Sequence, residues 1–80
     1  MTYEDLDKKI QWFEKYPDRS NEIYKGSTLY LTLCQTVEDY FAEQPPERFE
    51  TLEWQEETTG IMRRMNAIKS ECGRIMKHGR

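Results

Sequence analysis

The strongest constraint on the fold is a stripe of mostly apolar side chains in the last third of the chain. Its members are Trp54, Thr58, Ile61, Met65, Ile68, Cys72 and Ile75. Alternating steps of four and three residues place all seven on one face of an α-helix, as in a heptad repeat. The stripe keeps its phase through Gly60, so the sequence predicts one helix over residues 46–77. A break near Gly60 would instead give a bundle of four short helices.

A first helix is predicted over residues 3–16. Thr2 can cap its N-terminus, and Asp5 stands three residues later, where a capping box needs an acceptor. The apolar side chains on one face of this helix are Tyr3, Leu6, Ile10 and Phe13. Pro17 should end the helix, because the residue before a proline avoids helical dihedral angles.

A central helix is predicted over residues 20–43. Ile23, Tyr30, Leu33, Cys34, Val37, Tyr40 and Phe41 fall within one broad apolar arc. The stretch TLYLTL alternates like a strand, but it is short and lies within a longer helical period. Gly26 costs about 1 kcal/mol relative to alanine inside a helix, so a break there is an alternative.

The turn Gln44-Pro45-Pro46 joins the central helix to the long C-terminal helix and makes them antiparallel. The chain is therefore expected to form one all-α domain over residues 1–80, a three-helix bundle built on this helical hairpin. The hairpin register pairs Cys34 with Gln55 and Cys72 with Pro17. The two thiols should therefore lie far apart, and no internal disulfide is expected.

The C-terminal helix is longer than its partner, so its apolar stripe is expected to extend past the bundle beyond about Glu71. An apolar stripe that leaves the core usually meets a partner. The commonest partner is a second copy related by a two-fold axis, so a homodimer is expected. The residues predicted to mediate self-association are Ile68, Cys72, Ile75 and Met76.

Charge is unevenly distributed along the sequence. Residues 1–60 carry a net charge of −8, residues 61–80 carry +5, and the whole chain carries −3. The basic side chains that share one side of the C-terminal helix and could contact a phosphate backbone are Arg63, Arg64, Arg74 and Lys77. The simpler interpretation is that these cations offset the negative end of the helix dipole or pair with acidic residues of the same protein.

Other residues are candidates for binding another protein. Glu50, Glu53 and Glu57 share a face near the start of the C-terminal helix, where they form either a solvated surface or an acidic contact surface. The aromatic and apolar candidates are Trp12, Tyr16, Phe49 and Leu52. They either pack at the edge of the core or anchor a partner, as aromatic residues often do at interfaces.

Several function classes are not expected. No run approaches the ~18 apolar residues of a membrane span, and the N-terminal residues MTYEDLDKK lack a signal-peptide core. The spacing of the two cysteines matches no zinc motif, and no cofactor, metal or catalytic site is predicted, so an enzyme is not expected. We expect a cytoplasmic protein that acts by binding, as a protein–protein interaction or regulatory module such as a stoichiometric inhibitor. The alternative is a nucleic-acid-binding accessory protein.

Overall fold

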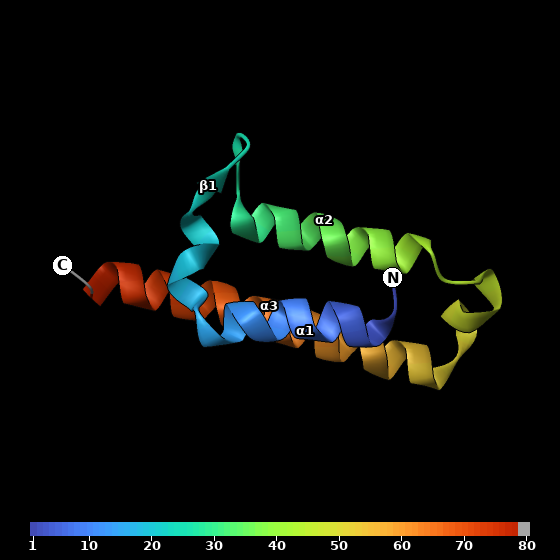
Figure 1. Ribbon diagram of the computed structural model, residues 1–80. Helices are drawn as coiled ribbons and strands as arrows, with labels where there is room; N and C mark the ends of the chain where they lie inside the picture. Colours follow the sequence, from blue (N-terminus) through green and yellow to red (C-terminus); the bar gives the residue numbers. More distant parts are fainter. Residues whose placement is uncertain (79–80) are drawn as a thin grey trace.

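The computed structural model describes residues 1–78, with side chains as far as Ile75. The described chain is an all-α helical bundle with little strand, as the sequence predicts. Its α-helices are α1 (Tyr3–Lys15), α2 (Leu29–Ala42) and α3 (Leu52–His78). Its shorter elements are the 3₁₀ turns η1 (Pro17–Asn21) and η2 (Pro46–Glu50) and the strands β1 (Ile23–Tyr24) and β2 (Ser27–Thr28). In Figure 1, α2 runs opposite to α1 and α3, and η2 joins α2 to α3 at one end of the bundle.

The start of α1 confirms the predicted capping box. The Thr2 hydroxyl accepts a hydrogen bond from the Asp5 backbone N–H at 3.2 Å, and the Asp5 carboxylate accepts one from the Thr2 N–H at 3.4 Å. Leu6, Ile10 and Phe13 are buried on the inner face of α1. The helix ends one residue before the predicted boundary, since Tyr16 leaves helical dihedral angles ahead of Pro17.

The prediction of a helix beginning at residue 20 is wrong, because α2 begins only at Leu29. Residues 23–28 form a β-hairpin with a two-residue turn, in which Ile23 pairs with Thr28 and Tyr24 pairs with Ser27. The turn needs positive φ at both central positions, and Lys25 and Gly26 adopt φ values of 53° and 85°. Gly26 adopts this angle without strain, so it breaks the predicted helix and supports the hairpin.

The long helix α3 is continuous through Gly60, which confirms the prediction from the heptad phase. It begins at Leu52 instead of Pro46, because Pro46 starts the separate turn η2. The hydroxyl of Thr51 accepts a hydrogen bond from the Trp54 N–H at 3.1 Å and so caps the new start. Since η2 lies outside α3, the pairing of residues between α2 and α3 also differs from the predicted register. Tyr30 bonds through its hydroxyl to the backbone carbonyl of Met65 at 3.0 Å.

The core lies where the three helices meet. Its buried members are Leu6, Ile10, Phe13, Leu33, Val37, Tyr40, Trp54, Ile61, Met65 and Ile68. The segment η1 packs against α3 toward the C-terminal end of the bundle. The expected overhang is therefore partly covered by the chain itself. Within residues 1–78, no helix combines the length and apolar character needed to cross a membrane.

Candidate functional site

The residues predicted to mediate self-association are mostly internal. Ile68 and Cys72 are only 2% and 4% exposed, so the expectation that they form an open apolar edge is wrong. The physical reason is η1, which turns back over the C-terminal half of α3 and covers the stripe there. Ile75 is 36% exposed at the margin. Met76 lies outside the described side chains. Both Cys34 and Cys72 are free thiols.

Part of the predicted basic face forms ion pairs with acidic residues of the same protein. Arg64 binds Asp7 at 2.5 Å and Glu14 through two contacts of 2.6 and 3.1 Å, so it links α3 to α1. The hydrogen bonds to Glu14 and Asp7 raise the pKa of the Arg64 guanidinium. Both carboxylates already engage the guanidinium, so Arg64 is less available to a phosphate than the sequence indicated. Its assignment as a phosphate-contacting residue stays a prediction.

The other basic candidates differ in their surroundings. Arg74 pairs with Glu71 one turn earlier on α3, with an Nε to Oε2 distance of 3.1 Å, and this contact raises the pKa of Arg74. Arg63 is exposed and makes no ion pair with any residue that the structure describes. The side chain of Lys77 lies outside the described side chains. The basic surface is therefore smaller than the sequence alone indicates.

Glu57 belongs to an internal polar cluster and is not part of an open acidic face. Its carboxylate accepts hydrogen bonds from Tyr40 at 2.9 Å and Arg48 at 3.1 Å, and its side chain is 13% exposed. The Arg48 guanidinium also lies 5.2 Å from the centre of the Trp54 ring. These contacts hold η2 against α2 and α3. Little of the Glu57 side chain is therefore available to a partner, and its assignment to partner binding stays a prediction.

Glu50 and Glu53 remain on the surface, and Glu53 lies 3.6 Å from Arg48. The apolar candidates Phe49 and Leu52 are also exposed, at 45% and 69%. Phe49 is partly covered because its ring packs against Trp54 at 5.3 Å between centroids. This end of the molecule therefore presents Leu52 as its most exposed apolar side chain.

Trp12 and Tyr16 lie side by side at the end of α1. Their ring centroids are 5.5 Å apart, and Trp12 also meets the edge of the buried Phe13 at 5.0 Å. The two rings are 42% and 40% exposed. Each side chain is partly covered and partly in solvent, so the sequence-based alternatives of flank packing and partner contact are both compatible with their positions.

The structure reveals another apolar surface that the sequence analysis missed. Ile23 and Tyr24 on the β-hairpin are 70% and 57% exposed, and Leu31 on the first turn of α2 is 57% exposed. We call these three residues the hairpin surface. Figure 1 shows the hairpin projecting away from the three helices. Gly26 was the one sequence signal for this hairpin, because the Lys25-Gly26 pair is not among the pairs typical of a two-residue hairpin turn.

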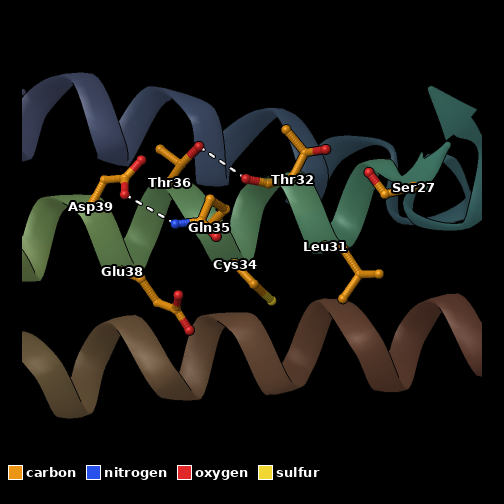
Figure 2. Close-up of a pocket in the computed structure, with 8 residues that line it drawn as sticks. All are labelled: Ser27, Leu31, Thr32, Cys34, Gln35, Thr36, Glu38 and Asp39. Carbon is orange, nitrogen blue, oxygen red and sulfur yellow. Dashed lines mark hydrogen bonds between the residues drawn. The ribbon is translucent and has the colours of Figure 1, made fainter. Parts of the chain in front are cut away.

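A groove begins at the base of this hairpin and follows the outer side of α2. Its volume is about 620 Å³, and its lining residues are Ser27, Leu31, Thr32, Cys34, Gln35, Thr36, Glu38 and Asp39. We call it the α2 groove. Figure 2 shows Leu31, Cys34 and Glu38 along one edge and Thr32, Thr36 and Asp39 along the other. The groove has an apolar end near the hairpin and an acidic end further along α2.

Hydrogen bonds within α2 fix part of the groove wall. Gln35 donates to the Asp39 carboxylate at 3.1 Å, and the Thr36 hydroxyl donates to the Thr32 carbonyl at 3.0 Å. Burial raises the pKa of the Cys34 thiol and the nearby Glu38 carboxylate raises it further, while Lys69 of α3 lowers it by a smaller amount. A thiol with a raised pKa is a poor nucleophile, so Cys34 contributes an apolar surface to the groove.

The described side chains include no group of three or more His, Cys, Asp and Glu residues that could hold a metal ion. Comparison of the chain with protein-family models, curated proteins and solved structures finds no match. The surface features therefore have to indicate the function.

Proposed function

We propose that this protein is a small helical module that works by binding another protein through the hairpin surface. The observation that carries the proposal is the exposure of Ile23 and Tyr24 on the projecting hairpin and of Leu31 on the first turn of α2. Large apolar side chains gathered on a soluble surface are typical of interaction sites, and tyrosine is among the residues enriched at binding hot spots.

The bundle gains little from the hairpin itself. Ile23 and Tyr24 leave most of their surface in solvent, and Lys25 adopts a φ of 53°, which is unfavourable for a side chain other than glycine. A shorter loop could connect η1 to α2 with less exposed apolar area. The projecting hairpin therefore adds little to the stability of the bundle, and this supports a role in binding.

Local contacts hold the hairpin in one shape. The backbone N–H of Leu29 donates to the Glu22 carbonyl at 2.8 Å and closes the hairpin base. The Lys25 ammonium lies 5.3 Å from the centre of the Tyr24 ring, which restricts that ring. A surface that is already ordered loses less conformational entropy on binding, so more of the contact energy appears as affinity.

The three apolar side chains set a scale for the affinity. Complete burial of an aliphatic or aromatic side chain stabilises by about 1.5–3 kcal/mol, and each of these is already partly covered. A partner could therefore gain about 3–6 kcal/mol from them before it meets the cost of association. Polar contacts around the surface are also needed for a micromolar complex, which requires about 8 kcal/mol.

Position-specific photocrosslinking in cells tests the proposal. Benzoylphenylalanine would replace Tyr24 in one variant and Tyr16 or Phe49 in two matched controls, since all three are aromatic and exposed. We expect a discrete protein adduct from position 24 that is weak or absent from the other two. Adducts only from positions 16 or 49, or none from position 24, would show that the hairpin is not the binding surface.

A further inference from the structure

We infer that the α2 groove receives a basic amphipathic segment of the partner protein, with an apolar side chain on Leu31 and cations at Glu38 and Asp39. This inference rests on the proposed function, because the groove begins at the hairpin surface. It adds the chemical class of the partner, which the apolar residues alone leave open.

The charge of the groove is the first reason. Neither its eight lining residues nor any position of α2 is a lysine or arginine. Glu38 and Asp39 therefore have no cation on their own helix. Among the described residues, Asp39 has Gln35 as a neutral hydrogen-bond donor, and Glu38 has no ion pair. Lys69 of α3 lies near Cys34, but no ion pair joins it to Glu38 or Asp39 within the described residues. Two carboxylates without an ion pair favour a positively charged partner.

The spacing of the groove is the second reason. Leu31 and Glu38 are seven residues apart on one helix, which corresponds to about 10 Å along the axis. A partner helix that crosses at a shallow angle would match this distance with an apolar and a basic residue seven positions apart. Figure 2 shows Leu31, Cys34 and Glu38 following one another along the same edge, so one helix face could contact all three.

The acidic end around η2 is the main competing surface, but its charges are partly balanced. Arg48 lies there and pairs with Glu57 and Glu53. The groove beside Leu52 is also lined by both Glu56 and Arg63, which have opposite charges. A basic segment would meet a cation at either place. The residues that line the α2 groove include no cation, and Lys69 lies outside that lining, near Cys34.

A second copy of this chain is the competing occupant, because residues 61–80 carry a net charge of +5. The apolar stripe of that segment is largely buried in its own bundle, and Arg64 and Arg74 are already paired. The large apolar side chains that the described part of this segment exposes are Met62 and Ile75, at 48% and 36%. They lie thirteen positions apart on different sides of α3, so they form no single apolar face for Leu31. These features favour a different protein as the occupant.

A defined peptide tests the inference on the intact ¹⁵N-labelled protein. The probe is a synthetic amphipathic helix of leucine and lysine with the length of α2, 14 residues. Its control carries glutamate in place of lysine. We expect the lysine peptide to shift amide resonances over residues 23–24 and 31–39, and the glutamate peptide to leave them unchanged.

Charge-reversal variants then test whether the lysine peptide binds the α2 groove or any acidic surface of the protein. Glu38→Lys with Asp39→Lys should weaken binding of the lysine peptide about tenfold or more, because two attractive contacts become repulsive. Glu47→Lys with Glu56→Lys changes the net charge by the same amount at the other acidic surface and should alter the affinity less than about twofold. Circular dichroism checks that both double variants remain helical.

Three results would overturn the inference. They are resonance shifts confined to η2 and the start of α3, equal losses in the two double variants, and concentration-dependent dimerisation that charge reversal at Glu38 and Asp39 abolishes. The proposed function has a separate test in the crosslinks from position 24. If those crosslinks form while the peptide fails to bind the groove, the hairpin surface still binds a protein, but that protein is not basic.

Discussion

Replacing Arg64 by alanine should destabilise the protein because it removes the ionic link between α3 and α1. The side chains of Arg64, Asp7 and Glu14 are 24%, 31% and 40% exposed, so water still screens the contacts. Each such pair stabilises by about 0.5–1 kcal/mol. Arg64→Ala removes both pairs, the packing of the arginine stem and the positive charge that offsets Asp7 and Glu14. Together these losses should lower the free energy of unfolding by about 2 kcal/mol.

Arg63 provides a matched control on the adjacent position of α3. It is exposed and makes no ion pair within the described part of the chain, so Arg63→Ala should change the free energy of unfolding by less than about 0.5 kcal/mol. Both substitutions change helix propensity equally. Urea denaturation followed by circular dichroism measures the difference between the variants, which should be about 1.5 kcal/mol or more.

Two additional measurements test whether the ion pairs of Arg64 cause this difference in stability. Arg64→Lys should lose part of the stability, because lysine keeps the charge without the two-pronged geometry. In about 1 M NaCl, where the screening length is about 3 Å, the gap between Arg64→Ala and Arg63→Ala should narrow. Equal stabilities for the two alanine variants at low salt would refute the assignment of Arg64 as a link between helices.

Further predictions concern the hairpin turn and the cap of α1. Lys25→Asn should raise the free energy of unfolding by about 0.5 kcal/mol, since asparagine tolerates positive φ, and Gly26→Ala should lower it by about 1 kcal/mol. No atom would obstruct the new Cβ at Gly26, so urea denaturation would report the backbone effect alone. The hydrogen bonds from Thr2 lower the pKa of Asp5 below its ordinary value of 3.8, and Thr2→Ala should raise it in an NMR titration. Because the folded-state pKa is depressed, this group stabilises the protein above pH 3.8, and that contribution is lost as the pH falls through the folded-state pKa.

Local patterns were sufficient to predict α1 and most of α3. The capping box at Thr2 and Asp5 involves residues three positions apart, so the sequence contains all of it. The heptad stripe predicted a continuous α3, since Trp54 before Gly60 and Ile61 after it keep the same phase and are both buried. Packing of these side chains outweighs the cost of one glycine in the helix.

The hairpin could not be separated from a helix by pattern alone. Ile23 fits the apolar arc of a helix, yet it is the most exposed of the large apolar residues that the structure describes. The choice depends on positive φ at Lys25 and Gly26, and a lysine gives little indication of it. Short strands also provide too few residues to establish a period of two.

Contacts between distant segments account for the remaining corrections. Arg64 was assigned to an open basic face because the sequence does not reveal that Asp7 and Glu14 lie beside it. Cys72 was assigned to an open edge because the path of η1 depends on the hairpin that follows it. In both cases a partner at least fifty residues away determines what the side chain does.

The affinity of a hairpin variant for the protein crosslinked at position 24 tests the central proposal most directly. Replacing both Ile23 and Tyr24 by serine should weaken that complex about a hundredfold or more, equivalent to about 2.7 kcal/mol. The same variant should keep its free energy of unfolding within about 0.5 kcal/mol, because both side chains lie largely in solvent. A variant that remains folded and binds the partner as tightly as the original protein would contradict the account.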